Sequence, residues 1–330
     1  MYKNWLVLIV VLFFVSCQSG KEFRHLTVVS YNVENLFDTI DDPHTRDNEF
    51  LPEGDKKWTS ERYEKKLNDI ARVLTAINPD DLPEIIGLTE VENRQVLDDL
   101  VNTDAMVPGD YQIVHQDSPD KRGIDVALLY RPVEFNFISF EAIPVDPGFA
   151  TRDILHVHGT FKKEDFHFFV NHWPSRIGGL EKSEPNRLVV AETLKAKVDE
   201  VLADDPDAHI VIIGDMNDEP QNKSLKEVLG AGIPDSDLAL VNLMMPLALE
   251  KKGTYNYRGN WNMLDNLVVS SNLLDKKGFQ VSPATGYIFR EAWMEYTNKE
   301  QEVSPNRTYG GPNYYGGVSD HFPVYFEMKK

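Results

Sequence analysis

The chain has 330 residues, of which 42% are hydrophobic and 26% are charged. A chain of this length and composition can bury a full core, which excludes a disordered polypeptide and predicts one large globular domain. The formal net charge is −19 at pH 7. Tight, non-specific binding to nucleic acid relies on Lys and Arg, so a protein of the strongly basic class is excluded, and a phosphate ligand would need a cation beside it.

The amino-terminal segment has the pattern of a targeting signal. Lys3 precedes the apolar run WLVLIVVLFFV, which is shorter than the roughly 20 residues that cross a bilayer. Residues 1–17 resemble a bacterial lipoprotein signal peptide with a lipid on Cys17, which predicts a membrane-anchored lipoprotein in the periplasm or on the cell surface. A short uncleaved anchor is the alternative. Residues 18–25 would be a tether. Cys17 is the only cysteine, so catalysis must use oxygen and nitrogen groups.

The elements predicted in chain order alternate between strands and helices. One amphipathic helix is predicted to follow a Ser60 N-cap and to run to Ile77, and another to run from a cap near Ser183 to Val201. No linker or repeat divides the chain, so residues 26–330 should form a single domain. Predicted loops cover 287–318 and the acidic stretch 38–50, whose carboxylates could alternatively hold calcium. The strands are predicted at 26–32, 85–91, 124–131, 154–161, 166–172, 209–215, 264–270 and 321–327.

Polar side chains cluster at the ends of these strands, and the ends of packed strands meet at one edge. Oxygen ligands without cysteine suit Mg²⁺ or Mn²⁺. Two histidines near carboxylates suit proton transfer and the stabilisation of a developing charge. The pattern therefore predicts metal-assisted hydrolysis of a phosphoester by water. The polar residues at strand ends are Asn32, Glu34, Glu90, Asn171, His172, Asp215, Asn217, Asp265, Asp320 and His321.

Six motifs carry a family resemblance when they are taken in order. YNVEN, LTEVEN, VNHWPSR, IGDMND, LDNLVVS and VSDH resemble the endonuclease/exonuclease/phosphatase superfamily, the group of deoxyribonuclease I and exonuclease III. The resemblance implies an α/β (α+β) fold of the deoxyribonuclease I kind, a four-layered α-β-β-α sandwich. It also implies a divalent-metal phosphodiesterase or phosphomonoesterase site at one edge.

The resemblance also implies a metal site. Glu90 would be the main ligand of Mg²⁺, or of Mn²⁺ or Ca²⁺, and Asn32 beside it would help to hold metal or phosphate. Asp320 would support the metal. Glu34 is a further candidate, because its position is acidic in some branches of the family.

Catalytic roles follow in the same way. Asp215 would orient or deprotonate the attacking water, and Asn217 would bind a phosphate oxygen. His321 would act as a base or phosphate donor oriented by Asp265, and His172 would bind phosphate or assist the leaving group. Taken singly, Asp215 and Asn217 would read as an Asx turn or a helix cap, and each histidine as an interior residue.

Substrate contacts are predicted for three further residues. Arg176 could clamp a phosphate, although a loop-fixing salt bridge is nearly as good an interpretation. Tyr315 could stack on a base or pack within its loop, and Asn171 adjoins His172. For Arg122, a phosphate contact and a structural ion pair are both open. Arg152 and Arg187 are expected to hold loops or helices together.

Several functions remain open from the sequence. The first is a phosphoesterase acting on a small molecule, a lipid headgroup or a nucleotide, including a sphingomyelinase-like activity. The second is a secreted nuclease for DNA or RNA, which the net charge slightly disfavours. The third is a non-catalytic, lipid-anchored binding protein, which is the weakest because the matched positions all carry competent residues. The inositol polyphosphate 5-phosphatase branch is disfavoured because NWNMLDNLVV lacks its Pro-Trp-Cys-Asp-Arg element. A monomer is expected.

Overall fold

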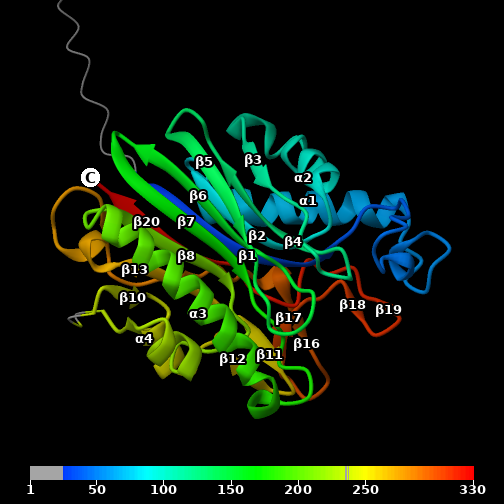
Figure 1. Ribbon diagram of the computed structural model, residues 1–330. Coiled ribbons are helices and arrows are strands. Elements are labelled where there is room, and N and C mark those ends of the chain that lie inside the picture. The colour runs from blue at the N-terminus through cyan, green and yellow to red at the C-terminus, as the bar shows by residue number, and fades with distance from the viewer. Residues whose placement is uncertain (1–24, 235, 237) are drawn as a thin grey trace, which may run out of the picture.

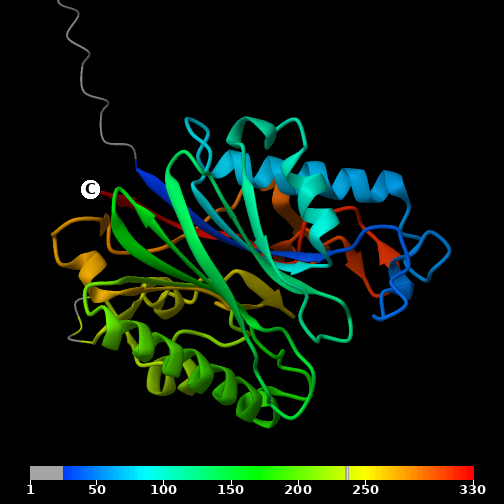
Figure 2. The ribbon, with the colours of Figure 1, turned by 45° about the horizontal axis from the view of Figure 1, so that its top comes forward.

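The computed structural model describes residues 25–234, 236 and 238–330, so the predicted signal peptide and Cys17 lie outside the described residues. Two seven-stranded sheets pack face to face, with helices on both outer faces (Figures 1 and 2). The predicted four-layered sandwich is confirmed. Within the described part of the chain, no helix is both long and apolar enough to cross a membrane.

The first sheet is built around a parallel pair. Strands β1 (Leu26–Leu36) and β2 (Ile85–Val91) run parallel, and helix α1 (Ser60–Ile77) connects them. Helices α1 and α2 (Arg94–Val101) lie on the outer face (Figure 1). The other strands are β3 (Gln112–His115), β4 (Asp125–Tyr130), β14 (Gln280–Val281), β15 (Tyr287–Ile288) and β20 (Val324–Lys329), and the sheet order is β14-β20-β1-β2-β4-β3 with β15 on β20.

The second sheet repeats this arrangement. Strands β7 (Glu164–His172) and β8 (His209–Asp215) run parallel, connected by the long helix α3 (Leu180–Asp204), which covers the outer face (Figure 2). The order is β5-β6-β7-β8-β13-β10-β9. The remaining elements of this half are β5 (Phe135–Ile143), β6 (Ile154–Phe161), β9 (Ala231–Gly232), β10 (Leu240–Asn242), β13 (Asp265–Ser270) and α4 (Met245–Leu249).

Three short hairpins and several short helical turns complete the chain. The hairpins pair β11 (Tyr255–Tyr257) with β12 (Asn260–Asn262), β16 (Glu295–Thr297) with β17 (Val303–Pro305), and β18 (Tyr309–Gly310) with β19 (Asn313–Tyr314). The segment 287–318, predicted as a loop, therefore contains short strands. The helical turns lie at Asn48–Phe50, Val107–Gly109, Ser224–Val228, Ser271–Leu274 and Ala292–Met294.

The core follows from the two-residue period of the strands. Val28 of β1 and Ile213 of β8 point into the layer between the sheets, where apolar side chains from both sheets meet. Val29, the next residue, points outward and packs with Ile70 of α1. On the other outer face, Leu194 of α3 packs in a third cluster. Both faces of each sheet are covered, which explains the nearly continuous apolar runs in these strands.

Several predicted boundaries are wrong. The N-cap of α1 is Thr59, whose side chain accepts a hydrogen bond from Arg62 N, and Ser60 is the first helical residue. Ser183 lies inside α3, where its hydroxyl donates to Gly179 O in the preceding turn. Strand β20 begins at Val324, because Pro323 has no backbone N–H to donate to a ladder. Strand β5 was missed, and its middle is largely exposed although it carries Ile138 and Phe140. Strand β3 and helix α2 were missed as well.

Candidate active site

A cleft of about 710 Å³ opens where the strand ends of the two sheets meet. The parallel register places His172 beside Asp215, and the antiparallel register places Asp265 on the other side of Asp215. The structure thus gathers most of the predicted residues at one edge. Those lining the cleft are Glu34, Glu90, His172, Arg176, Asp215, Asn217, Asp320 and His321.

Glu90 reaches the cleft because of a bulge. The pairing of β2 with β4 shifts register between Thr89 and Val91, and Glu90 between them has a φ of 64°. A bulge of this kind re-aims a side chain at the end of a strand. Glu90 Oε2 accepts a hydrogen bond from Asn35 N at 2.9 Å. The sequence motif therefore marks a local irregularity as well as a carboxylate.

Asn32 joins the two sheets behind the cleft. Its Nδ2 donates to Asp215 Oδ2 at 3.0 Å and lies 3.4 Å from Glu90 Oε1. Asn32 is 1% exposed and does not itself line the cleft. The amide positions two carboxylates from different sheets, a role that complements the predicted help in holding metal or phosphate.

Asp215 ends a strand whose preceding glycine has a steric purpose. Gly214 has a φ of 137°, and a Cβ there would lie 1.9 Å from Asn171 O. Asp215 Oδ1 accepts a hydrogen bond from Asn217 N at 2.8 Å, so the Asx turn is present. The other oxygen, Oδ2, accepts a hydrogen bond from Asn32 Nδ2. Asn217 has a φ of 49°, and its Nδ2 donates to Trp173 O at 3.0 Å. The IGDMND motif is therefore both a turn and one wall of the cleft.

His321 is held in a chain of polar contacts. Its Nδ1 lies 2.7 Å from Asp265 Oδ2, and its Nε2 lies 3.8 Å from Asp215 Oδ2. Thr254 Oγ1 donates to the same oxygen of Asp265. Burial opposes a charge on the imidazole, but Asp265 and Asp215 outweigh it and raise the pKa of His321 well above its ordinary value. The imidazolium is therefore the favoured form, with Nε2 directed at the site.

His172 has the opposite preference. Its Nε2 lies 3.8 Å from Glu90 Oε1 and 3.9 Å from Asp215 Oδ2. Burial, followed by the charges of Arg152 and Arg122, lowers the pKa of His172 well below its ordinary value. The cleft therefore presents one neutral and one charged histidine to the same space, an arrangement that can divide acid and base roles.

Asp215 titrates near neutrality in this setting. Burial raises its pKa to about 7, with the charge of Asp265 adding to the rise and His321 opposing it. A carboxylate in this range suits the exchange of a proton with a water molecule.

Glu34 contacts backbone more than it faces the cleft. Its carboxylate accepts from Thr308 N at 2.6 Å and from Tyr309 N at 3.3 Å. Burial and then the charge of Asp320 raise the pKa of Glu34 to about 7, while Lys66 opposes the rise. The structure thus assigns Glu34 contacts that anchor the 306–318 segment to β1.

Lys66 is a residue that sequence reasoning missed. It is 2% exposed, and its Nζ donates to Glu34 O and Val318 O. It falls on the buried stripe of α1 beside Tyr63 and Leu67, so its helical spacing was the available signal.

Most of the arginines are engaged in structural contacts. Arg176 donates to Asn217 O, Asn222 Oδ1 and Asn262 Oδ1 at 2.7 to 3.1 Å. Arg152 pairs with Asp120 at 2.8 Å, and Arg187 pairs with Asp218 at 2.8 Å. The expectation for Arg152 and Arg187 is confirmed, and Arg176 has the contacts of a loop-fixing residue, although it lines the cleft.

Arg122 is the more available cation. Its side chain is 50% exposed, and the ion pair it makes with Asp120 has an N–O distance of 3.6 Å. It lines the same cleft as Glu90 and His172. Arg122 can therefore turn toward a bound anion at a small cost in lost contacts.

Besides Asn32, three predicted residues do not line the cleft. Asn171 is fully buried, accepting from Trp173 Nε1 and donating to Phe169 O. Tyr315 is 59% exposed, does not line the cleft and lies against Gly310 on the β18–β19 hairpin. Asp265 is fully buried behind His321. Asp320 does line the cleft, where Arg307 Nη2 lies 3.2 Å from its Oδ2.

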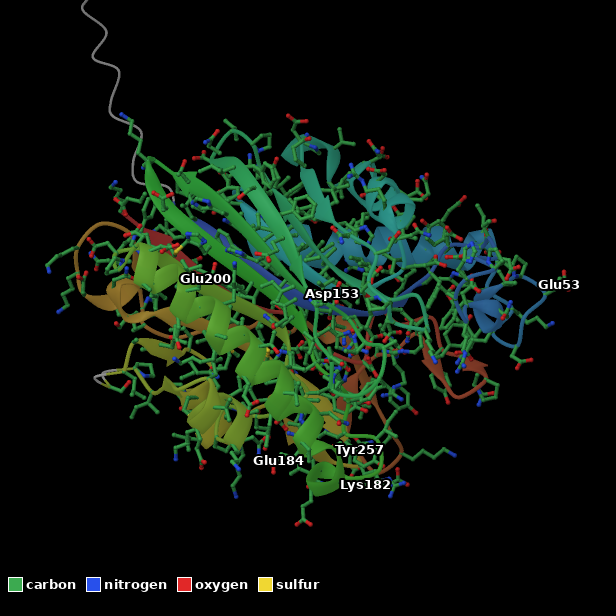
Figure 3. All side chains as sticks on the ribbon, viewed as in Figure 1. Glu53, Asp153, Lys182, Glu184, Glu200 and Tyr257 are labelled. Carbon is green, nitrogen blue, oxygen red and sulfur yellow. The ribbon has the colours of Figure 1, made fainter. Side chains whose placement is uncertain are left out.

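Two tyrosines of the cleft were also missed. Tyr255 and Tyr257 belong to β11, and the ring of Tyr255 lies 4.9 Å from that of His321. Tyr257, which is 53% exposed, projects at the same edge of the molecule as Lys182 near the start of α3 (Figure 3). The stretch TYNYRGNWN contains aromatic residues and a glycine, but its strands have only three residues each, too short to predict from the sequence.

The donor set of the cleft fits a hard divalent cation. Glu90 supplies a carboxylate oxygen, and Asn32 lies between it and Asp215, whose carboxylate can accept a hydrogen bond from water. Mg²⁺ binds one or two protein carboxylates and fills its other positions with water and substrate oxygens. Glu90, with Asn32 beside it, matches that requirement and would hold the ion. Among the residues that the structure describes, the acidic 38–50 stretch forms no group of three His, Cys, Asp or Glu ligands.

Comparison with known proteins identifies the family of the chain and agrees with its fold. A family model described as the endonuclease/exonuclease/phosphatase family matches residues 27–330. A humanised TDP2 of D. rerio has a TM-score of 0.59 and 14% identity over 93% of this chain and 99% of its own. A mannosyl-6-phosphatase of Bacteroides thetaiotaomicron has a TM-score of 0.56 and 20% identity over 92% and 99%. The human Nocturnin catalytic domain, with bound sulfate, has 0.56 and 16% over 93% and 95%. No curated protein matches the chain significantly in sequence.

Proposed function

Because this chain belongs to the endonuclease/exonuclease/phosphatase family, we propose that it hydrolyses phosphate esters with the help of a divalent metal ion. The observation that carries the proposal is the convergence of two histidines on one carboxylate: His172 Nε2 lies 3.9 Å and His321 Nε2 3.8 Å from Asp215 Oδ2, with Glu90 beside His172. Members of this family typically use Mg²⁺. The ion, held by Glu90 with Asn32 and Asp215 beside it, would supply Lewis-acid stabilisation of the phosphoryl charge.

The chain's own groups divide the remaining work. Asp215, with its pKa near 7, accepts the proton of the attacking water. His321 donates a hydrogen bond from Nε2 to a phosphoryl oxygen, because Asp265 holds its Nδ1 and keeps the ring charged. Neutral His172 donates from Nε2 to the phosphate or to the departing oxygen. Asp320 faces the same space and is balanced by Arg307.

We propose a small phosphate ester as substrate. Arg122 is the available cation of the cleft, and Tyr257 offers an exposed ring in the same cleft for the non-phosphate part of the substrate. A net charge of −19 opposes the approach of a long polyanion. The mannosyl-6-phosphatase neighbour supports this choice. The TDP2 neighbour solved with a single-strand DNA product supports the alternative of a nuclease.

The test is a substrate panel measured before and after metal removal. The panel holds p-nitrophenyl phosphate, bis-p-nitrophenyl phosphate, mannose 6-phosphate, sphingomyelin, DNA and RNA. We expect hydrolysis of a small ester that EDTA abolishes and that Mg²⁺ or Mn²⁺ restores. Full activity in a metal-stripped sample would refute metal dependence. Activity confined to DNA or RNA would favour the nuclease, and activity confined to sphingomyelin would favour the headgroup phosphodiesterase.

We also propose that the enzyme is anchored outside the cytoplasm by a lipid on Cys17, as the signal-like residues 1–17 indicate. Membrane attachment through a lipid would bring the cleft near a membrane surface without a spanning helix. A monomer suffices for this function, because one chain contributes the whole cleft.

A further inference from the structure

A second group of metal-ligand side chains lies outside the lining of the cleft, at the β3–β4 side of the first sheet. His115 ends β3, Asp125 begins β4, and Asp117 lies in the connection between them. One ligand atom from each lies within 4.8 Å of the others. His115 Nε2 lies 3.5 Å from Asp125 Oδ2 and 3.9 Å from Asp117 Oδ1. Among the described residues, no other three such side chains converge in this way.

The strand pairing explains why these side chains meet. His115 pairs with Ala127, so Asp125, two residues away, lies on the same face as a diagonal neighbour. Asp125 Oδ1 accepts hydrogen bonds from the backbone N–H and the hydroxyl of Ser118. These bonds fix the carboxylate and leave Oδ2 on the side of His115. Outer contacts of this kind commonly orient metal ligands.

An independent observation indicates a missing ligand. The side chain of His115 is only 3% exposed, and its Nε2 is buried without a hydrogen-bond partner. Buried polar atoms in folded proteins are nearly always bonded, so an orphaned ring nitrogen facing two carboxylates calls for an explanation.

We propose that His115, Asp117 and Asp125 bind one Zn²⁺ ion. An imidazole nitrogen with two carboxylate oxygens suits zinc better than Mg²⁺ or Ca²⁺, which prefer oxygen alone. Three protein ligands leave a fourth position of the usual tetrahedron for water. The side chain of Asp117 is 83% exposed, which gives the ion access from solvent.

The ion would close the β3–β4 connection and so act on the cleft from a distance. That connection carries Asp120, the buried partner of Arg152, and Arg122, which lines the cleft. A link between His115 and Asp117 at one end and Asp125 at the other restricts the segment between them. The zinc therefore orders the segment that carries Arg122, the available cation of the cleft.

The test isolates this site from the cleft by using Glu90→Gln, which removes the proposed ligand of the catalytic ion. Metal-stripped Glu90→Gln protein is titrated with Zn²⁺ in a calorimeter, and one equivalent should bind. Adding His115→Gln should lower the Zn²⁺ affinity by at least about tenfold, since loss of even an outer partner costs ~10- to 100-fold. Adding Asp117→Asn should do the same, and because Asp117 is exposed the fold should be unchanged.

The matched control is His158→Gln in the same background. His158 also lies next to a carboxylate, at 2.8 Å from Asp165 Oδ1, but has no second carboxylate in a ligand group. Zn²⁺ affinity should be unchanged in this variant. Hydrogen exchange gives a second readout, because Zn²⁺ should slow exchange in residues 116–124 of Glu90→Gln and not when His115→Gln is added. Absence of Zn²⁺ binding to Glu90→Gln, or binding that both His115→Gln and Asp117→Asn leave unchanged, would overturn the proposal.

Discussion

The two histidines of the cleft show how strongly the neighbours of a residue decide its chemistry. His321 contacts Asp265 directly, whereas His172 is close to arginines and meets its carboxylates only at 3.8 to 3.9 Å. Burial disfavours the charged form of both rings, but only His321 has a carboxylate in hydrogen-bond contact to reverse that effect. The same side chain is therefore favoured in its charged form at one position and in its neutral form at the other.

The first prediction concerns His321. Replacement by Ala should lower turnover on the best small ester by about 10² to 10⁴, the usual weight of a positioned proton-transfer group. Asp265→Asn should reduce turnover as well, because Asn cannot stabilise the charged ring. Steady-state kinetics and thermal melting of the purified variants measure both effects. Tyr315→Ala is the control, since this exposed tyrosine does not line the cleft. Near-normal turnover in folded His321→Ala would contradict the assignment.

The second prediction separates two arginines of the cleft. Arg122→Gln should raise KM about tenfold with little change in melting temperature, because its side chain is half exposed and weakly paired. Arg176→Gln should instead lower the free energy of unfolding by about 1–3 kcal/mol, since it leaves partly buried acceptors without their donor. Michaelis kinetics and urea unfolding distinguish the outcomes. A KM effect confined to Arg176→Gln would reverse the two roles.

At the scale of elements, strands β6 and β7 carry histidines on the outer face beneath α3. His156 Nε2 lies 2.9 Å from His167 Nδ1, and His156 stacks on Phe169. Burial, followed by the charges of His167 and Lys197, lowers the pKa of His156 to about 3. Burial and His158 lower the pKa of His167 to about 4. Near pH 6.5, where the histidines of the unfolded chain begin to bind protons, both rings are therefore still neutral in the folded protein.

This element predicts an acid-sensitive contribution to stability. Between about pH 6.5 and pH 3 the unfolded chain binds a proton at His156 that the folded chain does not bind, so stability falls as the pH falls. His156→Phe removes this difference. Its melting temperature relative to the unmodified protein should rise steadily from pH 7 to pH 5. Thr160→Val, on the same strand and face, changes no titratable group and should show a constant difference. A constant difference for His156→Phe as well would disprove the linkage.

The whole molecule combines a strongly acidic chain with a cleft that concentrates its polar groups at one edge of two sheets. Away from this edge, an apolar core fills the space between the two sheets and holds them together. The site can therefore hold strained positions, such as Glu90 with its positive φ, because the surrounding sheets fix them.

The prediction at this scale concerns location. Cys17→Ser should move the protein from the membrane fraction to the soluble fraction of the cells that produce it, because no lipid can be attached. Mass spectrometry of the protein without substitutions should show that Cys17 is the first residue and carries a diacylglycerol. The matched control is Ser19→Ala, two residues further along, which should stay with the membrane. An unmodified chain that still begins at Met1 in the membrane fraction would contradict the anchor.

The sequence by itself determined the fold class and the position of most of the site. Long apolar strands that end in Asn, Asp, Glu or His could be predicted, because burial imposes a pattern of apolar residues along the strand and the polar residue marks where that pattern ends. The order of six motifs added the layered architecture, which the structure confirms. A partly exposed strand such as β5 could not be predicted, because its residues do not alternate between buried and exposed positions.

Only the tertiary structure decided which polar residues share a space and which are already bonded. Asn171 and His172 are neighbours in sequence, yet the strand turns one toward Trp173 and the other toward the cleft. Arg122 and Arg176 are equivalent cations in the sequence, and only their partners distinguish them. The physical reason is that hydrogen bonds, burial and charge act between residues distant along the chain, so roles that depend on a partner are fixed only when the sheets bring that partner into contact.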